Sequence, residues 1–218
     1  DDYAHQIARE FEARKDEFGF SSPAYEAEKA LELALNETVK PVFVSDSGDN
    51  PTAGSTGDNT TIITLLSTDL IDNCKGKKIL VAGIYDPIAL EKLKENMHQE
   101  IELSIGGVYD TEYSEPCTLK GKAVRHVENF GIFASELMLF ETENFDLIIT
   151  SKHIGFTGVE MFKALEIDYM NTDVIVVKLG YLTPDFKEIA ARGYLALSRG
   201  CTDEVLSRLN YTHTYNLI

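Results

Sequence analysis

Hydrophobic residues recur with two different periods along the chain. In the first 40 residues they repeat every three or four positions, as they do on one face of a helix. The two stripes are Tyr3, Ile7 and Phe11, followed by Ala27, Ala30, Leu31, Ala34 and Leu35. Gly19 separates them, and Ser22-Pro23 has the residue types of a helix N-cap and first turn. The pattern predicts a helical extension over residues 1–40.

From Pro41 onward, short continuous apolar runs alternate with helical stripes. Such runs are typical of strands buried on both faces of a parallel sheet. Strands are expected at 42–44, 77–84, 145–150, 173–178 and 194–197, and helices at 59–70, 86–97, 159–165 and 184–192. This alternation favours an α/β fold.

The middle of the chain has a different pattern, because apolar and polar residues alternate there. The segment 101–105 alternates as a half-exposed strand does, 117–125 also alternates, and 132–140 is a second β-like run. The last two segments together are typical of an antiparallel hairpin. The prediction is therefore a mixed, largely parallel sheet flanked by helices, with an antiparallel β insert. Residues 41–218 are expected to form this α/β domain.

The net charge of −16 excludes some partners. Nucleic acids and anionic membrane surfaces both require a basic face, so neither is expected as a partner. No apolar run approaches the roughly 20 residues that span a bilayer. Cys74, Cys117 and Cys201 are odd in number and far apart, which favours reduced thiols in a cytoplasmic protein.

The connection from residue 45 to residue 58 is longer and more polar than packing requires. It holds three glycines and three aspartates, Asp46, Asp49 and Asp58, between a predicted strand and a predicted helix. Loops that follow strands in α/β proteins commonly carry sites, and Asp58 is placed as the helix N-cap. A solvated loop with a good cap explains the same spacing equally well.

Two other strand ends carry polar residues. The strand at 145–150 is followed by Ser151-Lys152-His153, and the strand at 173–178 ends at Lys178. Because the carboxyl ends of parallel strands share one edge, Lys152, His153 and Lys178 are predicted to meet Asp46 and Asp49. The alternative is that these lysines are solvated and pair loosely with surface acids.

Common catalytic and metal motifs are missing from the sequence. The five histidines form no His pair at metal-binding spacing, and there is no calcium loop, phosphate-binding loop or GxSxG elbow. A self-sufficient metal site is therefore not expected. Cys201, close to Asp203, leaves a stand-alone cysteine hydrolase as a weaker alternative.

The segment PVFVSDSGDNPTAGSTGD at 41–58 resembles the opening of the C-terminal domain of the MlrC family, the microcystinase-C-like metallopeptidases. The resemblance continues through Gly106-Gly107, through DLIITS at 146–151 with Phe156, and through VIVVK at 174–178. It covers roughly three-quarters of the chain. Departures at 152–155 and 179–182 favour a linear peptide or small amide, rather than microcystin, as substrate.

The resemblance implies that a larger N-terminal domain, absent from this chain, holds zinc, and that this chain holds no metal alone. The 45–58 loop would then complete a cleft between the two domains, and this chain would be inactive alone. Asp49 would act on the metal-bound water or orient the substrate amide. The implied catalytic residues are Asp46, Asp49 and Asn50, and the implied substrate-binding residues are Gly54, Gly57, Asp58, Ser151, Lys152, His153 and Lys178. The alternative function is a non-catalytic domain that binds a small ligand or assembles subunits.

Overall fold

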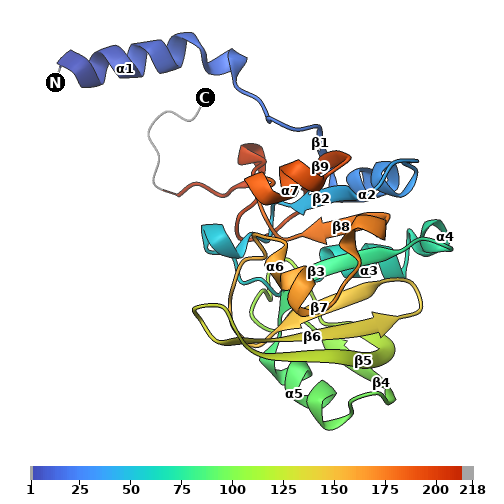
Figure 1. Ribbon diagram of the computed structural model, residues 1–218. Coiled ribbons are helices and arrows are strands. Elements are labelled where there is room, and N and C mark those ends of the chain that lie inside the picture. The colour runs from blue at the N-terminus through green and yellow to red at the C-terminus, as the bar shows by residue number, and fades with distance from the viewer. Residues whose placement is uncertain (1, 213–218) are drawn as a thin grey trace.

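The computed structural model describes residues 2–212, and its framework is a single nine-stranded sheet (Figure 1). The strand order is β1-β9-β2-β8-β3-β7-β6-β5-β4. The strands are β1 (Ala24–Glu26), β2 (Val42–Asp46), β3 (Ile79–Tyr85), β4 (Glu100–Ile105), β5 (Cys117–Phe130), β6 (Ser135–Thr142), β7 (Asp146–Thr150), β8 (Val174–Val177) and β9 (Arg192–Leu197).

Six strands, from β1 to β7 in the spatial order, run parallel to one another, and β7, β6, β5 and β4 pair antiparallel. The prediction of a mixed, largely parallel α/β sheet with an antiparallel insert is confirmed. The five predicted parallel strands begin and end within two residues of their expected bounds. Their continuous apolar runs were sufficient to locate them.

The helices are α1 (Asp2–Ala13), α2 (Ala27–Leu35), α3 (Thr61–Ser67), α4 (Ile71–Cys74), α5 (Pro87–Glu95), α6 (Glu160–Ala164) and α7 (Pro184–Ile189), with short 3-10 turns η1 (Lys15–Glu17), η2 (Pro51–Ala53), η3 (Tyr169–Asn171) and η4 (Leu206–Arg208). Helices α2 to α7 cover the two faces of the sheet, and α1 lies outside it. None of these helices, within residues 2–212, is long and apolar enough to cross a bilayer.

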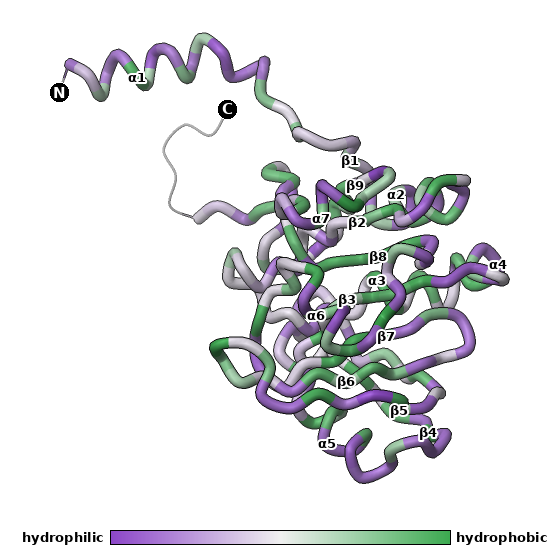
Figure 2. The backbone as a smooth tube through the Cα atoms, viewed as in Figure 1, coloured by the Kyte–Doolittle hydropathy of each residue, from purple (hydrophilic) through white to green (hydrophobic). Residues whose placement is uncertain are grey.

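Successive residues of each central strand enter two separate cores. On β2, Val42 and Val44 belong to the core that α2, α3 and α5 cover, whereas Phe43 belongs to the core on the other face, with residues of α6 and α7. The Phe43 ring stacks on Phe186 of α7 with centroids 5.1 Å apart. Figure 2 shows the result, with hydrophobic residues concentrated in the central strands and hydrophilic ones in the connections. Two buried faces explain why these strands are apolar at consecutive positions.

The N-terminal extension differs from its prediction. A helix starting near Ser22-Pro23 was expected, but Ala24–Glu26 form strand β1, which pairs in parallel with β9, and α2 begins only at Ala27. These residues form a strand because one side of β9 has no other strand to pair with. The predicted stripe of α2 from Ala27 to Leu35 is buried as expected.

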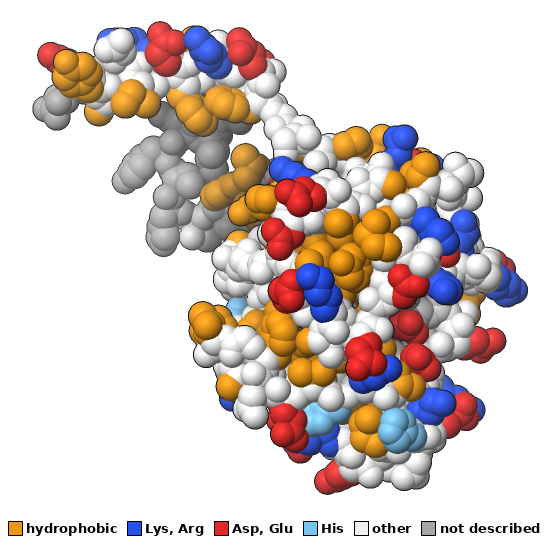
Figure 3. All heavy atoms as spheres, in the orientation of Figure 1, with side chains coloured by type: hydrophobic (Ala, Val, Ile, Leu, Met, Phe, Trp, Pro, Cys, Tyr) orange, Lys and Arg blue, Asp and Glu red, His pale blue; other side chains and the backbone are white. Residues whose placement is uncertain are grey.

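Helix α1 lies apart from the rest of the chain and buries no residue (Figure 1). Its hydrophobic side chains gather along one side and its charged ones along the other (Figure 3). Tyr3, Ile7 and Phe11 are 82%, 69% and 63% exposed. The predicted helix is confirmed, and its apolar stripe faces solvent.

This difference between α1 and α2 gives a stability prediction. Leu31→Ala in α2 removes a side chain with no exposed surface, so it should lower the free energy of unfolding by about 2–5 kcal/mol. Ile7→Ala in α1 should change it by less than about 0.5 kcal/mol. Urea denaturation followed by circular dichroism measures both. Equal losses in the two variants would contradict the assignment of α2 to the sheet core.

Candidate functional site

Polar loops gather at the edge of the sheet where the parallel strands end. Asp46 is the last residue of β2, Lys178 follows β8, and Ser198 follows β9. The strand neighbours β9, β2 and β8 are adjacent, so these three ends lie side by side. In doubly wound sheets this edge is where ligands bind.

Lys178 is the centre of this edge. Its side chain is 3% exposed, and Nζ lies 2.8 Å from Asp49 Oδ2, 3.2 Å from Asp46 Oδ2 and 2.7 Å from the carbonyl oxygen of Asn59. The prediction that Lys178 meets Asp46 and Asp49 is confirmed. Burial opposes the charge on Lys178, but Asp49 and Asp46 outweigh it and hold the Lys178 pKa above its ordinary value. Lys178 is therefore an ammonium ion inside the protein.

Asp49 uses both carboxylate oxygens within the loop. Oδ1 accepts hydrogen bonds from Ser55 Oγ at 2.6 Å and from the Gly57 amide at 2.7 Å. Oδ2 accepts from the Asn59 amide at 2.9 Å in addition to Lys178. Burial raises the Asp49 pKa, but Lys178 and these hydrogen bonds outweigh it and hold the pKa below its usual range. The ionised carboxylate thus fixes residues 55 to 59 around itself.

Asp46 is held differently. Ser198 Oγ donates to Asp46 Oδ1, and the Gly48 amide donates to Ser198 Oγ at 3.0 Å. Burial is the strongest influence on Asp46, and with the nearby Asp49 charge it raises the Asp46 pKa despite Lys178. Two buried carboxylates share one ammonium, and Asp46 is the one whose ionisation is disfavoured.

Asp58 is buried, and it does not cap the helix that follows. The N-cap of α3 is Thr60, without a side-chain cap bond. Asp58 Oδ2 instead accepts from the amides of Val108 and Tyr109 at 2.7 and 2.6 Å, and Oδ1 accepts from the Asp110 amide at 3.1 Å. The predicted cap is wrong because a neighbouring loop with three free amides competes for the same carboxylate.

The loop that Asp58 binds begins with Gly106 and Gly107, and its backbone conformation requires glycine at both positions. Both residues have a positive φ, +66° and +61°, which glycine adopts without strain. The Gly107 amide donates to the Asp58 carbonyl at 2.8 Å, and a Cβ on Gly106 would lie 2.5 Å from the same oxygen. Asp58 and the glycine pair therefore join the two loops.

The tip of the 45–58 loop is exposed. Asn50 Oδ1 accepts from the Thr52 amide at 3.0 Å and from Thr52 Oγ1 at 2.6 Å, which caps the short helix η2. Gly54 ends that turn with φ +97°. Thr52 and Gly54 are exposed, whereas Asp46, Asp49 and Asn50 are buried. The polar side chains that hold the loop are therefore inside the protein, and the tip from Thr52 to Gly54 faces solvent.

The segment after β7 borders this loop without reaching its acids. His153 Nε2 hydrogen-bonds the Ser55 carbonyl, and the Cδ2 atom of its ring would lie 3.5 Å from a Cβ on Gly57. Ser151 Oγ accepts from the Glu136 amide at 2.8 Å and so ties the segment to β6. Lys152 is exposed and forms no ion pair within residues 2–212. The prediction that Lys152 and His153 meet Asp46 and Asp49 is wrong, because β8 and β3 lie between β2 and β7, the strand that these two residues follow.

Five residues of the network were not predicted from the sequence. Asn59 Nδ2 donates to Asp110 Oδ2 at 2.7 Å and to the Arg199 carbonyl at 3.2 Å. Thr202 Oγ1 accepts from the Asn50 amide at 3.0 Å, and Ser198 holds Asp46. For Ser198, Arg199 and Thr202, the sequence did hold a signal. They belong to a polar run from Ser198 to Thr202, which also follows a parallel strand that ends at this edge.

The carboxylates here do not form a metal site. Asp46 and Asp49 surround the Lys178 ammonium, which occupies the position that a cation would take. In the part of the chain from residue 2 to residue 212, no three His, Cys, Asp or Glu side chains are grouped as metal ligands. The donor set fits an internal ion pair rather than a zinc ion.

Cys201 lies beside the loop as an exposed thiol. Partial burial of its sulfur, followed by the negative charges of Asp110 and Asp49, raises the Cys201 pKa. A nucleophilic cysteine needs a lowered pKa, so this environment opposes the cysteine hydrolase alternative.

The sequence profile of the MlrC C-terminus family matches residues 44–213, more than half of the 218 residues. The chain belongs to this family. It is 26% identical over 184 residues to microcystinase C from Sphingomonas sp., a match that covers 80% of this chain. The strand–DNP–glycine segment that carried the resemblance lies at the start of the matched region.

A solved structure has a similar fold. It is the crystal structure of a "Putative metallopeptidase" from Mesorhizobium sp. BNC1, and it superposes with a TM-score of 0.77 at 17% identity over 97% of this chain. The MlrC C-terminus chain spans 35% of the length of microcystinase C and 43% of that solved chain. Both are therefore much longer than the domain described here.

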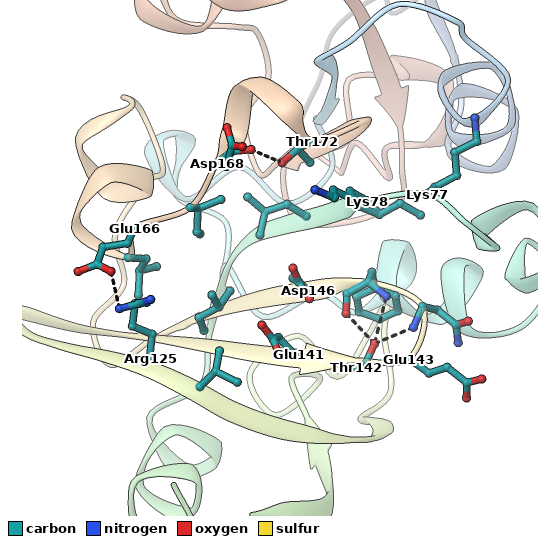
Figure 4. A pocket seen from close by; sticks show the side chains of 18 residues that line it. Lys77, Lys78, Arg125, Glu141, Thr142, Glu143, Asp146, Glu166, Asp168 and Thr172 are labelled. Atoms are coloured by element: carbon teal, nitrogen blue, oxygen red, sulfur yellow. Dashed lines mark hydrogen bonds and ion pairs between the residues drawn. The ribbon is translucent and has the colours of Figure 1, made fainter. Parts of the chain in front are cut away.

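A cleft of about 430 Å³ opens at the opposite edge of the sheet, where β3 and β8 begin (Figure 4). It contains none of the predicted site residues. Asp146 and Glu141 come to it from the neighbouring strands β7 and β6, and no drawn interaction reaches Asp146. Burial, together with the Glu141 charge, raises the Asp146 pKa to about 6.

The Asp146 carboxyl makes the stability depend on pH. The Asp146 pKa is about 6 in the folded protein, whereas an aspartate in an unfolded chain has the ordinary value of 3.8. Between pH 3.8 and pH 6 the folded chain therefore binds more protons than the unfolded chain. The free energy of unfolding should therefore fall as pH rises from 4 to 6. Asp146→Asn should remove this slope and stabilise the protein at pH 7 by about 1–2 kcal/mol, allowing for partial exposure. Urea titrations at several pH values measure this, with the exposed Glu95→Gln as control. An unchanged slope in Asp146→Asn would contradict the assignment.

Proposed function

We propose that this domain completes the active-site cleft of a metal-dependent peptidase or amidohydrolase and is inactive alone. The zinc ion belongs to an N-terminal domain of the full-length protein, and the substrate is a linear peptide or another small amide. The observation that carries the proposal is the 45–58 loop, fixed by buried charges at the ligand-binding edge of a sheet in an MlrC C-terminus domain. Three free cysteines favour a reducing compartment such as the cytoplasm.

The buried residues of the loop act as positioning residues in this proposal. Asp49 has four hydrogen-bond donors on its two oxygens, which leaves it to shape the loop rather than to contact substrate. The accessible groups beside it are the loop tip from Thr52 to Gly54, with Lys152 and His153. These groups are suited to hydrogen-bond a peptide and to hold its carboxylate or carbonyl groups. Direct catalysis by Asp46, Asp49 or Asn50 stays a prediction.

The edge also has the surface expected of a docking face for the N-terminal domain. The tip of the β5–β6 hairpin exposes Ile132 by 93% and Phe133 by 65%, and the loop held by Asp58 exposes Tyr109 by 49%. The hairpin tip lies at the same edge of the sheet as the 45–58 loop. Ser151, which follows β7 at this edge, accepts a hydrogen bond from the amide of Glu136 at the start of β6. Exposed apolar groups next to a polar loop are typical of an interface that encloses a site.

The second candidate is a non-catalytic domain that binds a small ligand or assembles subunits. The same exposed hairpin tip favours it, because an assembly surface needs no catalytic group. The two functions differ in whether the accessible polar residues affect turnover.

The test is peptide hydrolysis by the full-length, metal-loaded protein. The double variant Lys152→Ala and His153→Ala should lower kcat/KM by about tenfold or more, because it removes the accessible polar groups and the His153 contact to the Ser55 carbonyl, while Asp49 and Lys178 still hold the loop. Lys187→Ala, on the exposed surface of α7, is the control and should match the unmodified protein. Bound metal and thermal midpoint are measured alongside. An unchanged kcat/KM in the double variant, with metal content unaltered, would favour the assembly function.

A further inference from the structure

A cleft of about 350 Å³ lies on the α7 side of the sheet, next to the 45–58 loop. Its floor comes from β2 and β9, and one wall comes from the segment that follows β8. The residues that precede β1 close it on a third side. The lining includes Phe20, Ser45, Tyr181, Leu182, Leu195 and Glu204. The volume is at the lower end of the range for small-molecule sites and suits a molecule about the size of one amino acid.

Ser45 places an unpaired polar atom in this cleft. Its residue is 2% exposed, and Oγ has no hydrogen-bond partner within residues 2–212. Buried hydroxyl groups are nearly always hydrogen-bonded, because an unmet bond costs about 1–3 kcal/mol. A hydroxyl group held without a partner in a cleft is therefore suited to bind a polar group of a ligand.

Glu204 places an acid without a cation in the same cleft. No Lys, Arg or His within residues 2–212 forms an ion pair with it, and the nearby Arg208 binds Asp203 and Glu26 instead. Burial and the Asp203 charge both disfavour ionised Glu204 and raise its pKa. A cation beside Glu204 would favour the ionised carboxylate and so lower the Glu204 pKa.

Gly180 joins the cleft to the loop described above. A Cβ on Gly180 would lie 2.7 Å from Glu204 Oε1 and 3.2 Å from Asn50 Nδ2, so both side chains approach its bare backbone. The apolar part of the lining comes from Phe20, Leu182 and Leu195, and Ser21 and Ser22 line the side that precedes β1. The cleft thus combines one acid, one unpaired hydroxyl and a short apolar surface.

We propose that this cleft is a binding site for a small molecule that carries a primary ammonium group on a short apolar body. The ammonium pairs with Glu204 and donates a hydrogen bond to Ser45 Oγ, and the hydrocarbon part packs on Leu182 and Leu195. Such a group occurs on free amines and at the amino end of peptides. The site does not depend on the proposed peptidase role, since none of the residues assigned to that role binds the ligand.

The test is isothermal titration calorimetry of the 218-residue chain with isoamylamine, and with isoamyl alcohol as an uncharged analogue of the same shape. The amine should bind saturably and at least about tenfold more tightly than the alcohol. Equal binding of the two, or no saturable binding of the amine, would overturn the proposal. Leucyl-glycyl-glycine forms a second arm: tighter binding than isoamylamine identifies a peptide amino end as the ligand, and weaker binding identifies a free amine.

Two variants locate the binding in the cleft. Glu204→Gln keeps the shape and removes the charge, so it should weaken amine binding about tenfold and leave alcohol binding unchanged. Ser45→Ala should weaken amine binding about threefold or more, and it breaks no internal hydrogen bond, so folding is preserved. Glu188→Gln, an exposed acid on α7, is the control and should bind as the unmodified chain does. Unchanged amine affinity in Glu204→Gln would overturn the proposal, and it would leave the peptidase proposal untouched because no hydrolysis is measured.

Discussion

The buried ion pair between Lys178 and Asp49 is the interaction on which the functional edge depends. A lysine with no access to water is tolerated only where nearby carboxylates and a carbonyl oxygen replace its hydration. Here Asp49, Asp46 and the Asn59 carbonyl provide that replacement at 2.8, 3.2 and 2.7 Å. Since these groups come from both ends of the 45–59 connection, the charge of Lys178 closes that connection into a defined loop on β8.

The closed loop then organises its neighbours. Asp58 fixes the loop that starts at Gly106, and Asn59 binds Asp110. On the other side, Ser198 and Thr202 hold Asp46 and the Asn50 amide from the segment that follows β9. Segments distant in sequence thus converge on one edge, while the loop tip stays accessible. A rigid polar anchor beneath an exposed tip is a suitable support for a site that a second domain completes.

The sequence was a good guide where one physical pattern dominated. Continuous apolar runs located the parallel strands, and the β-like runs at 117–125 and 132–140 located the antiparallel hairpin. Its first strand extends to Phe130, and its second begins only at Ser135, because residues 131–134 form the turn. Strand β1 was missed, because three residues carry too little pattern and pairing with β9 decides their conformation. The Lys178 contact was predictable from strand-end convergence. Asp58 was misjudged, because capping is a local rule and its real partners are some 50 residues away.

A double-mutant cycle on Lys178 and Asp49 tests the central claim most directly. Unfolding free energies of Lys178→Met, Asp49→Asn and the double variant would be measured by urea denaturation. Lys178→Met leaves the Asp49 carboxylate buried without a cation, and Asp49→Asn leaves Lys178 with Asp46 alone, the carboxyl group whose ionisation burial disfavours. Each single change should cost about 3–5 kcal/mol, while the double variant should cost at least about 2 kcal/mol less than the sum. Additive losses would contradict the account, because they would mean that the two residues stabilise the loop independently.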